Sequence, residues 1–233
     1  MIKCKLAAAL AIFSFVVSMA TVVMARPVPF KPGETIRYSI KQAGVKVGAA
    51  SLVFIGEQLL AGQKAVLIVF TSKGFNFFDE ERIFMDPDTF LPRTIVRDLN
   101  IFGNREKITE DYDPTGAGIK VTKVADGKTT VATLTKKGAV DNIYGFIYRY
   151  RAQGEFIKGE KLALRLPTLD VMMENAGDVT FHAAGKTYTS ALMRSVPAKY
   201  SVWMDKSDRR LPLRIAGAVG IANTVMTMIG YEP

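Results

Sequence analysis

Turn-forming residues interrupt this chain every eight to fifteen residues, so most segments are long enough for a strand and too short for a stable isolated helix. Asp126-Gly127 is the clearest turn, because Asp-Gly supplies the positive φ angles of a two-residue hairpin loop. Residues 119–125 and 128–134, on its two sides, are rich in Val and Thr. Residues 34–40 alternate apolar and polar side chains, as a half-buried strand does. This spacing predicts an antiparallel sheet of mostly short strands.

One segment departs from the strand pattern. At about residues 141–153, apolar and aromatic side chains recur at the spacing of one helix face. Asp141 or Asn142 can cap the start of this helix, and Gly154 can end it. We therefore predict a mainly β fold, an antiparallel curled sheet or open barrel with one packed helix at about 141–153. The sequence leaves open whether the curled sheet encloses a cavity.

The N-terminal segment has the three parts of a secretory signal. A basic head with two lysines precedes an uncharged stretch at 6–24, and small-residue cleavage sites end at Ala20 and Ala25. We predict a signal peptide at 1–25, a single β-rich domain at 26–233 and a periplasmic or otherwise exported location. The alternative is an uncleaved anchor in the inner membrane, because 19 uncharged residues approach the ~20 that cross a bilayer. After cleavage, no further membrane span is expected.

Charge and cysteine content exclude several classes of function. Cys4 is the only cysteine and precedes the apolar stretch, so the exported domain would have no disulfide, thiol nucleophile or cysteine-bound metal. The formal net charge of +9 is modest and spread along the chain. A nucleic-acid-binding domain concentrates its basic residues on one face, so we expect no nucleic-acid partner.

Several short motifs occur in order along nearly the whole exported part of the chain. They are rich in Gly, Pro, Asp and aromatic residues and lie at 30–34, 44–50, 86–92, 141–149, 159, 203–205 and 210–215. In this order they resemble the bacterial domain-of-unknown-function 3108 family. The resemblance implies an exported, β-rich cell-envelope protein without an assigned activity, and it provides no catalytic residues. Gly145 departs from the small polar residue expected after Asp141.

Catalytic motifs are absent from the sequence. There is no nucleophile elbow, zinc-protease motif or phosphate-binding loop. His182 is the only histidine, and its strand context predicts an exposed surface residue. We therefore predict no enzyme activity, catalytic residue, metal or cofactor. Carboxylates offer the remaining catalytic alternative, a glycan hydrolase that uses Glu80, Asp111 and Asp113.

Two groups of residues are candidate contact sites. Phe75, Phe77 and Phe78 fall within four residues, which is more aromatic surface than one strand face can bury, so they are candidates for an apolar ligand or a membrane. Five lysines between positions 120 and 137 form the densest basic stretch. Its candidate residues for a protein partner or lipid headgroups are Lys120, Lys123 and Lys128.

These observations favour an envelope protein that binds an apolar or amphipathic ligand such as lipid. The first alternative is a structural or partner-binding periplasmic module that uses the lysine-rich hairpin or a sheet edge. The second alternative is the carboxylate-based glycan hydrolase.

Overall fold

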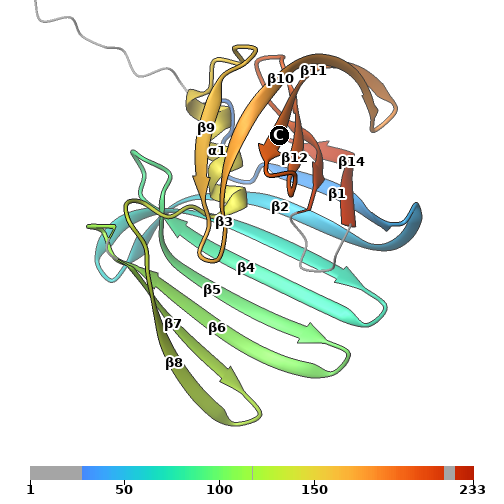
Figure 1. The fold of residues 1–233 in the computed structure, drawn as a ribbon. Helices are drawn as coiled ribbons and strands as arrows, with labels where there is room; N and C mark the ends of the chain where they lie inside the picture. Colours follow the sequence, from blue (N-terminus) through green and yellow to red (C-terminus); the bar gives the residue numbers. More distant parts are fainter. Residues whose placement is uncertain (1–27, 117, 218–223) are drawn as a thin grey trace, which may run out of the picture.

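The computed structural model describes residues 28–233 except residue 117 and residues 218–223. In this part of the chain, one sheet of fourteen strands surrounds one helix (Figure 1). The first half of the chain supplies β1 (Thr35–Gln42), β2 (Val45–Leu60), β3 (Gln63–Gly74), β4 (Phe77–Met85), β5 (Pro92–Ile101), β6 (Asn104–Tyr112), β7 (Gly118–Ala125) and β8 (Lys128–Thr135). The second half supplies α1 (Ile143–Gln153), β9 (Lys161–Arg165), β10 (Asp170–Ala183), β11 (Lys186–Val196), β12 (Ser201–Asp205), β13 (Pro212–Ala216) and β14 (Thr224–Glu232). The predicted segment 1–25 lies outside the described residues.

Every strand pairs antiparallel with its neighbour, and consecutive strands lie side by side. The order is β8-β7-β6-β5-β4-β3-β2-β1-β14-β13-β12-β11-β10-β9, in which β1 and β14 join the two halves of the chain. The two edges, β8 and β9, are not paired with each other, and α1 connects them in sequence. The predicted mainly β fold, with a curled antiparallel sheet and one packed helix, is confirmed.

The helix α1 is buried on nearly every side. Asn142 is its N-cap, since its side-chain oxygen accepts hydrogen bonds from the backbone N–H groups of Tyr144 and Gly145. All residues of α1 except Arg149 and Gln153 are buried. At Gly145 the helix approaches β4 so closely that an added Cβ would lie 3.3 Å from the Met85 sulfur. A larger residue at this position would require the Met85 side chain to move by a few tenths of an ångström.

A buried ion pair fixes the last turn of α1 to the start of β1. The Arg151 guanidinium donates to both carboxylate oxygens of Glu34, over 2.6 and 2.8 Å, and neither side chain is exposed. The rings of Phe30 and Tyr148 lie on the same guanidinium, each with its centroid 4.9 Å from the central carbon. Because a lone buried charge is very unfavourable, the pair stabilises the position in which Arg151 of the helix meets Glu34.

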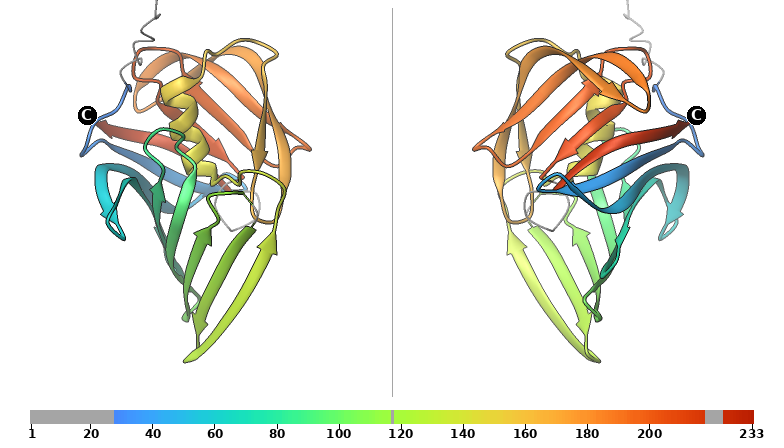
Figure 2. Two further views of the ribbon diagram at one scale, coloured as in Figure 1. Left: turned by 90° about the vertical axis from the view of Figure 1, so that its left-hand side faces the viewer. Right: turned by 90° about the vertical axis from the view of Figure 1, so that its right-hand side faces the viewer.

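The core is confined to the part of the sheet around α1. Its buried members come from α1, from β1–β5, from β9–β14 and from the loops beside them. Figures 1 and 2 show that β6, β7 and β8 extend below the helix. Seven of the eight residues of β8 are exposed. Beyond Ile95 in β5 and the buried Ile119 in β7, strands β5–β8 therefore present an inner face that the core cluster does not cover.

Candidate functional site

Charged side chains occupy the inner face of the sheet below α1. In a strand, alternate residues share a face, and residues directly opposite each other on paired strands also share one. Ile83 and Ile95 are paired core residues, so Glu81, Asp79 and Arg97 lie on the same inner face as they do. Arg97 donates from Nε and Nη2 to the two oxygens of Asp79, over 2.7 and 2.6 Å. Its Nε also lies 3.6 Å from Glu81 Oε1.

The start of α1 closes over this charged group. The Asn142 amide donates to Glu81 Oε2 over 3.1 Å, in addition to capping the helix. Burial raises the pKa of Glu81 to about 7; Arg97 and Asn142 oppose this shift, while the charge of Asp79 adds to it. Glu81 therefore holds its proton to a higher pH than an ordinary glutamate does.

Tyr144 lies next to this group and has an unpartnered hydroxyl. Its ring stacks on Phe70, with centroids 4.1 Å apart and an interplanar angle of 18°. The hydroxyl is buried and makes no hydrogen bond. The Ser72 hydroxyl is also buried and makes no hydrogen bond. Burial raises the pKa of Tyr144, and the charges of Glu81 and Asp79 raise it further. A buried hydroxyl without a partner is unfavourable, so this place has capacity for a further polar group.

Beyond the charged group, apolar and charged side chains alternate on the inner face towards the hairpin tips, since Leu99 pairs with Glu106 and Ile108 pairs with Lys123. Pairing places Leu99 and Ile101 of β5 on the inner face, with Ile108 of β6 opposite Arg97 and Val121 of β7 opposite Glu110. All four apolar side chains are partly buried, and none belongs to the core cluster or packs against it. We call these four residues, Leu99, Ile101, Ile108 and Val121, the inner apolar strip.

Paired charges lie among the members of the inner apolar strip, directly across from Leu99, Ile108 and Val121. Lys123 donates to Glu106 across β6 and β7, and both are on the inner face. The Tyr112 hydroxyl donates to Glu110 over 2.6 Å, and burial, followed by the Glu110 charge, raises the pKa of Tyr112. An apolar strip between compensated polar groups matches a molecule with an apolar chain and a polar end.

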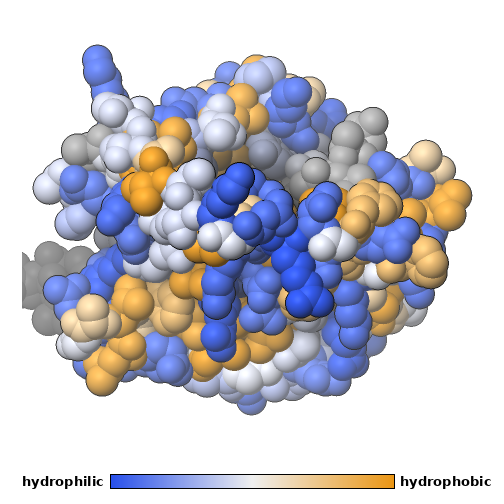
Figure 3. Space-filling view, turned by 90° about the horizontal axis from the view of Figure 1, so that it is seen from below, coloured by the Kyte–Doolittle hydropathy of each residue, from blue (hydrophilic) through white to orange (hydrophobic). Residues whose placement is uncertain are grey.

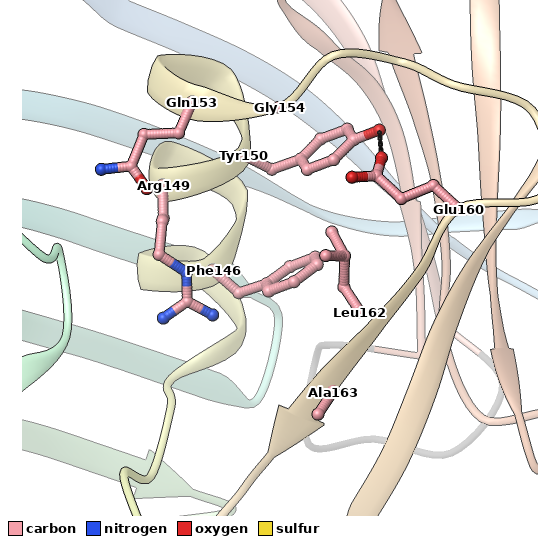
Figure 4. Close-up of a pocket in the computed structure, with 8 residues that line it drawn as sticks. All are labelled: Phe146, Arg149, Tyr150, Gln153, Gly154, Glu160, Leu162 and Ala163. Atoms are coloured by element: carbon pink, nitrogen blue, oxygen red, sulfur yellow. Dashed lines mark hydrogen bonds between the residues drawn. The ribbon is translucent and has the colours of Figure 1, made fainter. Parts of the chain in front are cut away.

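A hollow lies between α1 and the edge strand β9 (Figure 4). Its volume is about 180 Å³, and it is lined by Phe146, Arg149, Tyr150, Leu162 and other residues. The Tyr150 hydroxyl donates to Glu160 over 3.1 Å across this hollow. Sites for drug-sized ligands usually measure about 300–1,000 Å³, so this hollow is too small for a lipid.

The three candidate phenylalanines lie on three different surfaces. Phe75 is at the tip of the β3–β4 hairpin and is 96% exposed. Phe77 points inward and packs against the core, close to the backbone of Gly48 and Gly74. Phe78 points to the outer face, since it is adjacent to Phe77 in the same strand. The three side chains do not form one site.

The three candidate lysines also lie on different surfaces. Lys123 is on the inner face in its pair with Glu106, and Lys120 is exposed on the outer face. Lys128 follows the Asp126-Gly127 turn at the hairpin tip and is exposed.

The carboxylates of the hydrolase alternative are dispersed. Glu80 and Asp111 lie on the outer face, and Asp113 accepts hydrogen bonds from Thr115 within a turn. Asp79 and Glu81 do converge, but both are largely covered, and Arg97 occupies both oxygens of Asp79. His182 is exposed, as predicted, and its Nδ1 lies 2.9 Å from the Thr187 hydroxyl.

Sequence reasoning missed Asp79, Glu81, Arg97 and Tyr144 as one group. Their signal was weak, because a charged residue at an inward position of a strand resembles an outward one until the strand pairing is known. Among the described residues, no group of three or more His, Cys, Asp or Glu side chains could hold a metal ion. No helix in the same part of the chain is long and apolar enough to span a membrane.

No family model, curated protein or solved structure matches this chain.

Proposed function

We propose that this protein is an exported cell-envelope protein that binds a lipid-like, amphipathic molecule on the inner face of its open sheet. The inner apolar strip carries this proposal. Its four side chains face inward, are partly buried and are not used by the core. In a folded domain of this size, inward apolar residues normally pack against one another, so a strip left open at this position suits an apolar chain.

Polar groups at the upper end of the strip suit the polar end of such a ligand. The unpartnered Tyr144 hydroxyl and the Glu81 carboxyl, whose pKa is raised, both lie there. The N-terminal sequence pattern and the resemblance to the domain-of-unknown-function 3108 family support an envelope location. The open edges β8 and β9 leave a route by which a long molecule can enter from the side.

Native mass spectrometry of detergent-free protein purified from the periplasm, with lipid extraction, tests this proposal. Wild-type protein should carry a lipid of defined mass. An Ile108→Asn variant should lose most of that lipid, because it places an amide in the inner apolar strip. The matched control is Val131→Asn, which makes the same kind of change on the outer face of β8 and should retain the lipid. A bare polypeptide in every preparation, or equal occupancy in both variants, contradicts the proposal.

The second candidate is a partner-binding module. One observation favours it: β8 is an edge strand of eight residues, seven of them exposed, with Val131 60% exposed. Such an edge is a template for a strand from another protein. A Thr133→Pro substitution should then abolish recovery of an envelope protein with the wild-type chain as bait. Recovery of the same protein by this variant contradicts strand addition.

A further inference from the structure

Four hairpin tips lie in a row along one edge of the β1–β8 half. Because consecutive antiparallel strands are neighbours, the turns β1–β2, β3–β4, β5–β6 and β7–β8 all fall on the same side (Figure 1). Neighbouring tips are two strands apart, or about 10 Å. The backbone N–H of Phe102 in the β5–β6 turn donates to the Asn76 carbonyl in the β3–β4 turn over 2.8 Å, so these two tips are joined. We call this row the hairpin rim.

The hairpin rim exposes large apolar side chains. Phe75 is 96% exposed, Phe102 is 75% exposed and Val45 is 67% exposed, and they come from three successive tips. A Phe ring that packs on nothing adds no stability to the fold. Seen from below, the molecule shows hydrophobic patches divided by hydrophilic side chains (Figure 3).

The backbone at Phe102 adds a second argument. Its φ is +53°, a conformation that strongly favours Gly, Asn or Asp and disfavours a bulky side chain. The equivalent position of the next tip is Asp126, with a φ of +50°. The β1–β2 tip has Ala43 at the equivalent position, with a φ of +48°, so this turn accepts a small side chain and does not require a large apolar one. An external apolar partner would give the 75% exposed Phe102 ring a contact that the fold does not provide.

Cations surround the apolar tips. Within three residues of the four turns, the exposed basic side chains without an ion pair in the described structure are Lys41, Lys46, Lys73, Arg105 and Lys128. The acidic residues in the same stretches are Asp79, Glu106 and Asp126; Asp79 is paired with Arg97 and Glu106 with Lys123. The hairpin rim is therefore strongly positive, with apolar side chains at its outermost points.

We propose that the hairpin rim docks onto the surface of an anionic lipid bilayer. Apolar side chains at the tips would enter the headgroup region, and the surrounding cations would contact lipid phosphates. The combination of basic side chains with large apolar side chains at the tips argues for an anionic membrane, whose surface offers both phosphates and an apolar layer beneath them. The site is distinct from the inner apolar strip and does not depend on it. Ile101 of the strip directly precedes Phe102 of the rim, so a docked rim would place the open end of the strip at the membrane.

Flotation with vesicles provides the test. The folded chain without residues 1–25 is mixed with vesicles of phosphatidylcholine alone or with 30% phosphatidylglycerol added, a ratio of about 7:3 that gives a clear negative surface. Binding should require phosphatidylglycerol and should weaken as salt rises. Each Lys or Arg contact contributes about fivefold in affinity, and a buried Phe ring contributes roughly tenfold or more.

Matched variants separate the rim from the rest of the surface. Phe75→Ser with Phe102→Ser should lower vesicle binding at least tenfold, whereas Leu59→Ser, 74% exposed on the opposite edge, should leave it unchanged. A variant in which four basic residues of the rim are replaced by Gln should bind vesicles far more weakly than a variant in which four basic residues elsewhere are replaced by Gln. The rim set is Lys46, Lys73, Arg105 and Lys128, and the control set is Lys64, Lys120, Lys158 and Lys186.

Three results would overturn the proposal. The first is equal binding by rim and control variants, and the second is equal binding to both vesicle compositions. The third is self-association in the absence of vesicles that disappears in the Phe75→Ser variant, which would assign the rim to a second copy of the chain. Lipid carried by the purified protein is measured in a separate experiment. Absence of vesicle binding would therefore contradict only membrane docking by the rim, and absence of bound lipid would contradict only ligand binding by the inner apolar strip.

Discussion

Glu81 is a buried carboxyl group that shares one cation with a second carboxylate. Arg97 is engaged by both oxygens of Asp79 and only approaches Glu81, at 3.6 Å. The single guanidinium therefore cannot compensate both negative charges, and burial raises the pKa of Glu81 from 4.5 to about 7. At the residue scale, this is the most pH-sensitive group described on the inner face.

The raised pKa makes the stability depend on pH. The folded state favours the protonated form of Glu81. Its contribution to the free energy of unfolding is therefore fully present below about pH 4.5 and is lost as the pH rises through about 7. Between about pH 5 and pH 8, the free energy of unfolding of the wild type should fall by about 2–3 kcal/mol relative to Glu81→Gln. Chemical denaturation of both proteins across this range measures the difference. A difference that does not change with pH contradicts the assigned pKa.

At the element scale, α1 depends on the link that Asn142 makes between helix and sheet. The same side chain accepts from the first-turn N–H groups and donates to Glu81. The helix is otherwise held by its apolar surface and by the Arg151–Glu34 pair at its other end. Asn142 therefore positions the end of α1 that covers the charged group.

Substitution of Asn142 separates its two roles. Asn142→Ala should lower the free energy of unfolding by about 1–2 kcal/mol, because both the cap and the bond to Glu81 are lost. Asn142→Asp keeps a capping oxygen but places a second carboxyl group against Glu81, so its loss of stability should be small at pH 5 and larger at pH 8. Thermal unfolding at the two pH values measures this. Identical behaviour of the two variants would mean that the bond to Glu81 contributes nothing.

The whole molecule divides into a packed part around α1 and a thin part made of β6–β8. The core cluster draws its buried members from the first part, and β8 is exposed along almost its whole length. Backbone hydrogen bonds without a packed layer over them open readily. The thin part also carries half of the inner apolar strip, Ile108 and Val121, and the β7–β8 tip of the hairpin rim.

Hydrogen exchange should report this division. Amides of β7 and β8 should exchange much faster than those of β1–β4 and α1 in lipid-free protein. Addition of a lipid that occupies the inner apolar strip should slow exchange in β5–β7 and leave the core strands unchanged. Mass spectrometry of peptides across the chain measures both effects. Uniform protection in lipid-free protein contradicts the division.

The sequence by itself determined the fold class, the position of the helix and several turns. Apolar spacing identifies the helix at 141–153, observed at Ile143–Gln153, and Asp126-Gly127 adopts the positive φ angles that its chemistry favours. These features depend on local backbone preferences and on side-chain periodicity, which a sequence carries directly.

Only the tertiary structure decided where the candidate site lies. Strands β4 and β6 were not recognised from the sequence, because charged residues such as Glu81 and Glu106 stand at inward positions and break the expected alternation. Such a residue becomes an inner-face group only once strand pairing fixes the face of every neighbour. The same pairing brings Phe102 next to the tip that carries Phe75 and separates Phe75 from Phe77. Register and strand order, which depend on contacts between distant segments, therefore determined both the inner apolar strip and the hairpin rim.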